Sequence, residues 1–282
     1  MIAGCRQLVC GGHTIRLDRP RLMGVLNVTP DSFSDGGQFL RPADALARAL
    51  QMQDAGADII DVGGESTRPG AEAVGAREEL GRVMPVIEAI VPKLSVPVSI
   101  DTGKPEVMRA AVAAGASLIN DVYALRHEGA LATAAELGVP VCLMHMQGRP
   151  RQMQDEPAYD DVVAEVKAFL LRRADACRQH GIGRENIVLD PGFGFGKTLQ
   201  HNIALFRALP ELAACGYPLL VGVSRKTMIG QLTGRDAGER LPGSVTAAAL
   251  AALGGAAILR VHNVAASRDA LRVATALGSL NA

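Results

Sequence analysis

The stretch MGVLNVTPDSFSDGG, residues 23–37, begins as an apolar strand and ends in a polar, glycine-rich loop. The strand ends at Asn27, and the loop after it places hydroxyl and carboxylate side chains around one aromatic residue, Phe33. A loop of this polarity beside a buried strand is typical of a flap that meets a polar ligand. A solvated turn would have the same composition, so the interpretation depends on whether the pattern recurs along the chain.

Short apolar runs do recur, and amphipathic helical patterns rich in Ala and Leu alternate with them. The predicted strands are residues 22–27, 57–64, 97–101, 117–121, 140–145, 186–190, 219–224 and 257–262. Several helical patterns stop at glycines, as helices commonly do at their C-caps. Eight strands that alternate with helices in 282 residues predict one α/β domain over residues 1–282, a (β/α)8 TIM barrel. The alternating N-terminus predicts a β-hairpin ahead of it. An open doubly wound sheet is the alternative.

The composition argues against several classes of function. Lys plus Arg equals Asp plus Glu at 29 each, so nothing predicts binding to nucleic acid or to an acidic membrane surface. The five cysteines are scattered without a CxxC pair, which argues against a disulfide framework or a zinc knuckle. The N-terminus lacks the apolar run of a signal peptide, and no segment approaches the roughly 20 apolar residues of a membrane span. We therefore expect a cytoplasmic protein.

Polar side chains stand at the C-terminal end of every predicted strand. They are Asn27, Asp61, Asp101, Asn120 with Asp121, His145, Asp190, Ser224 to Lys226, and Arg260 with His262. Burying a carboxylate at the end of a strand is costly unless partners are waiting for it. One such residue could be a structural Asp, but polar residues at all eight ends predict a site at the mouth of the barrel.

This set divides into two chemical halves. The first combines carboxylates, an amide and an ammonium, which suits a flat nitrogen heterocycle with adjacent donor and acceptor edges: Asp101, Asn120, Asp190 and Lys226. The second offers donors to an anion such as a diphosphate leaving group, beside an amide that could hold a metal ion: Arg68, Arg260, His262 and Asn27. His145 stays open between ligand contact and a structural role.

Two motifs look like other catalytic signatures but do not match them. GFGFGKT, residues 192–198, fits neither the P-loop nor the GxGxxG pattern, because Pro191 and Lys197 stand where glycines belong. GVSRK, residues 222–226, begins like a nucleophile elbow but has Lys226 in place of the last glycine. We therefore expect no side-chain nucleophile.

With these residues in place, the chain resembles the dihydropteroate synthases, and the resemblance covers about residues 14–275. The motifs that carry it, in the family's order, are MGVLNVTPDSFSDGG, GGESTRPGA, SIDT, INDV, LMHMQG, LDPGFGFGK, GVSRK and ILRVHNV. The resemblance implies an enzyme of folate biosynthesis that joins 4-aminobenzoate to 7,8-dihydropterin-6-ylmethyl diphosphate and releases diphosphate. It also implies Mg²⁺ as cofactor, sulfonamides as inhibitors, and a homodimer.

The resemblance also assigns roles to residues of this chain. It places the pterin in a pocket formed by Asp101, Asn120, Asp190 and Lys226, with Met144 and Phe195 as walls. It places the diphosphate and Mg²⁺ at Asn27, Thr67, Arg68, Arg260 and His262, with Asn27 as the metal ligand. It places 4-aminobenzoate at Phe33, Thr67, Pro69 and Thr227. Catalytic roles fall to Asp35, Lys226, Arg260 and His262, with Asp35 expected to stabilise the cationic pterin methylene.

The sequence departs from the family pattern at two positions, and two alternative functions stay open. Thr227 stands where the family often has Ser, and Asn263 stands where it commonly has Asp. A pterin-dependent methyltransferase domain would share the barrel and the pterin pocket but would need no diphosphate site. A non-catalytic pterin-binding paralogue is the other alternative. Only a synthase would couple diphosphate release to 4-aminobenzoate.

Overall fold

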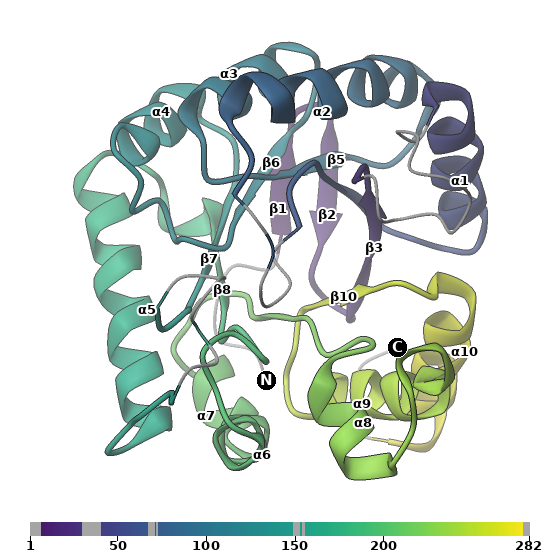
Figure 1. The fold of residues 1–282 in the computed structure, drawn as a ribbon, viewed down its shortest axis with the longest axis vertical. Coiled ribbons are helices and arrows are strands. Elements are labelled where there is room, and N and C mark those ends of the chain that lie inside the picture. The colour runs from purple at the N-terminus through teal and green to yellow at the C-terminus, as the bar shows by residue number, and fades with distance from the viewer. Residues whose placement is uncertain are drawn as a thin grey trace.

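The computed structural model describes residues 7–29, 41–66, 71, 73–148, 153 and 156–278. Eight parallel strands form one sheet in the order β8-β7-β6-β5-β4-β3-β10-β9. A parallel bridge between Leu189 and Leu219 brings the two ends of this order together, so the sheet closes into a barrel. The helices surround it, as Figure 1 shows. The predicted (β/α)8 barrel is confirmed, and the open sheet is excluded.

The strands are short and almost entirely buried, as parallel strands covered on both faces should be. Their bounds are β3 (Arg21–Asn27), β4 (Ile59–Gly63), β5 (Val98–Asp101), β6 (Leu118–Asp121), β7 (Val141–Met144), β8 (Ile187–Asp190), β9 (Leu220–Val221) and β10 (Ile258–Val261). The prediction of a strand over 219–224 was too long at its end. The chain leaves the sheet after Val221 because the next residues form the turn that carries Lys226.

The helices lie on the outside of the barrel (Figure 1). They are α1 (Pro42–Asp54), α2 (Ala76–Ile90), α3 (Pro105–Ala113), α4 (Ala130–Leu137), α5 (Val162–Gln179), α6 (Leu199–Arg207), α7 (Leu209–Ala213), α8 (Thr227–Thr233), α9 (Leu241–Leu253) and α10 (Val264–Leu277). Gly138 ends α4 in the left-handed conformation, and Gly56, Gly115 and Gly181 adopt positive φ just after their helices. This confirms the predicted glycine stops. No helix in the described ranges is long and apolar enough to cross a membrane.

An antiparallel hairpin of β1 (Gln7–Cys10) and β2 (His13–Arg16) precedes the barrel, as predicted. Its buried side chains pack against one ring of inward-facing residues near the N-terminal ends of the strands. We call this ring the floor layer: Met23, Ile59, Leu118, Cys142, Val188, Leu220 and Ile258. The hairpin residues in the same cluster are Leu8, Cys10, Ile15 and Leu17. The hairpin therefore seals the N-terminal end of the barrel with apolar side chains.

A second ring lies two residues further along the strands, on the same inward side because side chains alternate along a strand. We call it the pocket layer: Asp61, Asn120, Met144, Asp190, Gly222 and Arg260. The register of β7 and β8 follows these layers, since Cys142 pairs with Val188 in one and Met144 pairs with Asp190 in the next. The strands are staggered elsewhere, where Asn120 pairs with Cys142 and Arg260 with Met23. The inward-facing side chains thus change from apolar to mostly polar within one two-residue repeat of the strands.

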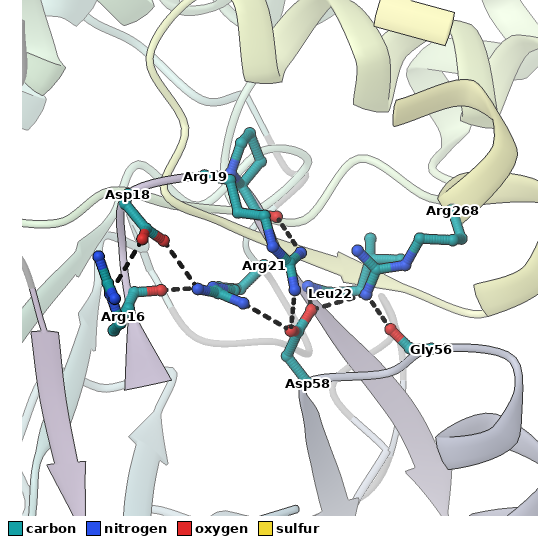
Figure 2. A network of polar contacts seen from close by, with 9 residues as sticks. Arg16, Asp18, Arg19, Arg21, Leu22, Gly56, Asp58 and Arg268 are labelled. Carbon is teal, nitrogen blue, oxygen red and sulfur yellow. Dashed lines mark hydrogen bonds and ion pairs between the residues drawn. The ribbon is translucent and has the colours of Figure 1, made fainter. Parts of the chain in front are cut away.

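A polar network joins the starts of β3 and β4 to helix α10 (Figure 2). Asp58 accepts from three guanidinium groups, those of Arg19 at 3.1 Å, Arg21 at 3.2 Å and Arg268 at 2.8 Å. Its Oδ2 also accepts from the backbone N–H of Leu22 at 2.8 Å. Because Asp58 is mostly buried, these contacts compensate the desolvation of its charge. The network holds the barrel together at the end opposite the pocket.

Candidate active site

One pocket opens at the C-terminal ends of the strands and contains about 450 Å³ of open space. Its lining residues are Asp101, Asn120, Val122, Met144, Asp190, Gly192, Phe193, Phe195, Gly222, Ser224, Lys226, Arg260 and His262. All six residues that the sequence analysis assigned to the pterin lie in this lining, and so do Arg260 and His262. The strands converge there because parallel strands of a barrel all end at one face.

Arg260 forms the centre of a buried ion-pair network in this pocket. Its Nε donates to Asp61 Oδ2 at 2.7 Å, and its Nη2 donates to Asp101 Oδ2 at 2.8 Å. Asn120 Nδ2 donates to the same Asp61 oxygen at 3.2 Å. Burial opposes the charge of Arg260, but the carboxylates of Asp61 and Asp101 outweigh it and raise the pKa of the guanidinium. The guanidinium is therefore a fixed positive charge, and these contacts use two of its five N–H groups.

Asp61 was not among the assigned site residues, although the sequence placed it at a polar strand end. It is completely buried, and its Oδ1 has no hydrogen-bond partner within the described ranges. The sequence does contain the information needed to find it. Asp61 follows the floor-layer residue Ile59 by two positions, so its side chain had to point inward.

Asp190 and Lys226 face each other across the pocket from β8 and the turn after β9. Asp190 Oδ1 accepts from the backbone N–H of Gly192 at 2.7 Å. Burial raises the pKa of Asp190 to about 6, while the Gly192 N–H and Lys226 oppose this. Burial lowers the pKa of Lys226 to about 8, and Arg260 adds to this. Both groups titrate close to neutral pH, which is common in binding and catalytic sites.

The side chain of Lys226 lies against an aromatic wall. Its Nζ is 4.0 Å from the centre of the Phe195 ring, a cation–π distance. Lys226 follows Arg225, a non-glycine residue with a φ of 59°, whose backbone N–H donates to Ser244 Oγ at 2.9 Å. This sharp turn ends the sheet and aims Lys226 at the pocket.

Of the residues assigned to the diphosphate, Arg260 and His262 line the pocket, and Asn27 does not. His262 Nδ1 is 3.1 Å from Ser224 Oγ. Asn27 ends β3 next to Gly63, where a Cβ would lie 3.6 Å from Asn27 Oδ1 and 3.7 Å from Asp101 Oδ2. Within the described ranges, no three His, Cys, Asp or Glu side chains gather as a metal site. Mg²⁺ is usually held by one or two carboxylates and the phosphates of a substrate, and the Asn27 amide offers an oxygen of the same hard donor type.

Some assigned residues lie outside the described ranges: Phe33, Asp35, Thr67, Arg68 and Pro69. Thr227 is described and is the exposed first residue of α8, directly after Lys226. Asn263, which departs from the family pattern, accepts from Arg225 Nη2 at 2.9 Å. The Asn263 amide oxygen thus binds Arg225, the residue of the turn that directly precedes Lys226.

The segment that leads into residues 67–70 is anchored by a cluster of charges. Lys104 Nζ lies 2.5 Å from Glu65 Oε2 and 2.5 Å from Glu79 Oε2. Glu65 Oε1 also accepts from the backbone N–H of Val74 at 3.2 Å. Glu65 therefore links the two sides of this segment.

His145, which the sequence left open, contacts Lys197 and does not line the pocket. Its Nδ1 is 2.9 Å from Lys197 Nζ, and its ring packs edge-on against Phe169 with 4.9 Å between ring centres. Burial lowers the pKa of His145 to about 3, and Lys197 adds to this. The imidazole is therefore neutral.

Comparisons with known proteins agree with this geometry. The family model described as "Pterin binding enzyme" matches residues 23–262. The chain is 53% identical over 270 residues to the dihydropteroate synthase of Escherichia coli strain K12, and 96% of each protein is covered. It is 55% identical over 275 residues to that of Neisseria meningitidis serogroup C, with 95% of this chain and 96% of the relative covered.

Solved structures give the same result. Dihydropteroate synthase from Xanthomonas albilineans with 4-aminobenzoic acid matches with a TM-score of 0.92 and 55% identity, over 97% of this chain and 98% of that one. The Yersinia pestis enzyme in a sulfonamide drug complex matches with a TM-score of 0.93 and 49% identity, over 96% and 98%. Family model, relatives and fold agree over nearly the whole length, and the chain therefore belongs to the pterin-binding enzymes, within the dihydropteroate synthases.

Proposed function

We propose that the chain condenses 7,8-dihydropterin-6-ylmethyl diphosphate with 4-aminobenzoate, giving 7,8-dihydropteroate and diphosphate. The observation that carries this proposal is the single pocket in which Asp190, Asn120 and Lys226 adjoin Arg260 and His262. A solved relative, the Xanthomonas albilineans enzyme, is described in complex with 7,8-dihydropteroate and matches this chain with a TM-score of 0.87. The chemistry of the pocket suits that ligand at both ends.

The inner end of the pocket suits the pterin ring. An ionised Asp190 accepts from adjacent N–H groups of the heterocycle, and Asn120 offers both a donor and an acceptor. The Lys226 ammonium donates to the carbonyl or a ring nitrogen. Met144 and Phe195 cover the flat faces, because aromatic and thioether groups pack well on a planar ring. Asp101 acts on this end through Arg260, to which it is bound.

The outer end suits the diphosphate. Arg260 and His262 would donate to its oxygens, together with Thr67 and Arg68, and Asn27 would hold Mg²⁺. When bound there, Mg²⁺ would supply further positive charge beside the leaving group. Fixed donors of this kind stabilise negative charge as it develops on diphosphate. The fixed charge of Arg260, set by two carboxylates, is ready for this role before the substrate arrives.

The reaction then needs no side-chain nucleophile. The bond between the pterin methylene and the diphosphate oxygen breaks, and the diphosphate leaves with the electron pair. The amine nitrogen of 4-aminobenzoate donates its lone pair to the methylene carbon and then loses a proton. We assign the stabilisation of the cationic methylene to Asp35, and the binding of 4-aminobenzoate to Phe33, Thr67, Pro69 and Thr227. Sulfonamides would compete at this outer position.

We also propose that the enzyme works as a homodimer in the cytoplasm. Exposed apolar side chains gather on α8, α9 and α10: Leu232, Leu241, Leu250, Leu253, Val273 and Leu277. A second copy of the chain would remove these surfaces from water. Free cysteines support a reducing compartment: Cys10, Cys142, Cys177 and Cys215.

Diphosphate release, measured with and without 4-aminobenzoate, tests the function. We expect release only when both substrates are present, with one dihydropteroate formed for each diphosphate. Release that is independent of the amine, or no release at all, would contradict the proposed synthase activity.

Asp190→Ala should abolish binding of the pterin diphosphate while the circular dichroism spectrum stays unchanged. Asp175→Ala, which removes an exposed carboxylate on α5, is the matched control and should bind normally.

A further inference from the structure

A lysine lies buried behind the pocket, and the proposed reaction does not use it. Lys197 is 3% exposed, and its Nζ is within hydrogen-bond distance of three carbonyls and one imidazole nitrogen. The distances are 2.9 Å to Gly192 O, 3.0 Å to Phe195 O, 3.3 Å to His145 O and 2.9 Å to His145 Nδ1. Burying an ammonium without a carboxylate partner in contact is costly, so its retention calls for a reason.

The carbonyls that Lys197 binds belong to residues of the pocket wall. Gly192 and Phe195 both line the pocket, and they form one turn in which Phe195 N–H donates to Gly192 O at 3.1 Å. Gly192 N–H donates to the Asp190 carboxylate, and the Phe195 ring lies on the Lys226 ammonium. One end of this turn therefore holds the Asp190 carboxylate, which we assign to the edge of the pterin. The other end carries the Phe195 ring, which we assign to its face.

The turn lies close against the loop that follows β7. Gly192 has a φ of 70°, and a Cβ there would lie 1.9 Å from His145 O. Gly196 has a φ of 61°, and a Cβ there would lie 2.4 Å from Gln147 O. On the other side, Asn202 Oδ1 accepts from Gly194 N–H at 2.8 Å. Lys197 thus completes a turn that is held on every described side.

We propose that Lys197 is a positioning residue for the pterin site. Its ammonium pulls the carbonyls of Gly192 and Phe195 to one point and so fixes both the Asp190 carboxylate and the Phe195 ring relative to Lys226. The inference rests on the proposed function, because it takes the pterin as the ligand between these groups. Lys197 does not line the pocket, so its effect passes through the turn.

The charge of Lys197 adds an electrostatic effect to the mechanical one. Asp190 faces three cations, namely Lys226, Lys197 and Arg260, and all of them favour its ionised form. Lys197 in turn faces Asp190, Lys226 and the neutral imidazole of His145, which also lies near Arg126. Burial lowers the pKa of Lys197 to about 7, and Asp190 opposes this shift. Removing the ammonium removes one of the charges that keep Asp190 ionised.

Lys197→Met tests the proposal, because it keeps the length of the side chain and removes every donor. We expect the KM for the pterin diphosphate to rise about tenfold, the lower end of the loss seen when the supporting partners of metal ligands are removed, with little change in kcat. A purely structural role would instead reduce the folded fraction, lowering the apparent kcat and leaving KM unchanged. Lys167→Met, at a lysine paired with Glu211 outside the site, is the matched control and should change neither constant.

Asn202→Ala separates the mechanical effect from the electrostatic one. It loosens the same turn but keeps the charge of Lys197, so it should raise the pterin KM without moving the pH below which pterin binding is lost. Lys197→Met should raise both the pterin KM and that pH. The chain has no Trp, so pterin fluorescence can report binding at each pH against a dark protein background.

An unchanged pterin KM in folded Lys197→Met would overturn the proposal, and so would a loss confined to kcat. If Lys197→Met does not fold, Asn202→Ala becomes the test, and a wild-type pterin KM in that variant would overturn the proposal. Asp190→Ala is measured in parallel. Normal pterin binding in that variant would refute the proposed site itself, whatever Lys197 does.

Discussion

Removing the Asp61 carboxylate should weaken both the fold and the reaction, and the structure sets the size of the effect. Breaking a buried ion pair by removing one partner typically costs about 3–5 kcal/mol. Arg260 keeps its bond to Asp101 and is 22% exposed, so we expect Asp61→Ala to lie at the lower end, about 3 kcal/mol. Asp61→Asn keeps an acceptor for Arg260 Nε and loses only the charge, so about 1 kcal/mol is expected.

Asp61→Ala should also lower the activity. Without Asp61, the Arg260 guanidinium can rotate about its remaining bond to Asp101 and leave the position that we assign to diphosphate binding. At metal sites, losing the partner that orients a ligand typically lowers affinity or activity about 10- to 100-fold, and we expect a loss of the same order here. The effect should appear in kcat/KM for the pterin diphosphate.

Two measurements check this prediction. Urea unfolding at pH 7 gives the free energies of the wild type, Asp61→Asn and Asp61→Ala, and steady-state diphosphate release gives kcat/KM. Asp175→Ala, which removes an exposed carboxylate, is the control for the loss of a charge alone. The reasoning is refuted if Asp61→Ala unfolds within about 1 kcal/mol of the wild type, or if it keeps wild-type kcat/KM.

Three further predictions follow from single features. Gly192→Ala should lower the melting temperature strongly, because its Cβ would lie 1.9 Å from His145 O; an unchanged melting curve would contradict the close packing. Pterin affinity should rise between pH 5 and pH 7 as Asp190, whose pKa burial raises to about 6, becomes ionised, and calorimetry in two buffers near pH 6 should detect a released proton; a flat profile would exclude this role. Glu65→Gln should raise the KM for 4-aminobenzoate by weakening the link between Glu65 and Val74, whereas Glu136→Gln, at an exposed pair with Arg109, should not; equal effects would argue against the link.

The barrel and the location of its site could be predicted from the sequence, because both depend on local patterns. Apolar strands that alternate with amphipathic helices define the barrel, and the ends of parallel strands must meet. The family motifs then gave roles to most of the polar ends. Of the assigned residues that the structure describes, all line one pocket except Asn27 and Thr227.

The contacts among charged side chains could not be predicted in this way. Asp61 and Arg260 are 199 positions apart, and nothing local indicates that they pair. The same holds for Asp58 and Arg268, which are 210 positions apart. The position of Lys197 could not be predicted for a different reason, since a lysine in a glycine-rich loop ordinarily points to solvent. Only the fold shows that this loop turns inward over the β8 end.

The two-residue step between the floor layer and the pocket layer limits how this protein can evolve. On most strands, the residue that seals the barrel and the residue at the level of the pocket are separate positions. Substitution can therefore change ligand chemistry while leaving the seal intact. Inserting or deleting a single residue within a strand would turn both side chains outward at once and destroy seal and site together. New specificities in this scaffold should accordingly arise by substitution in the pocket layer and by length changes in the loops above it, never by length changes in the strands.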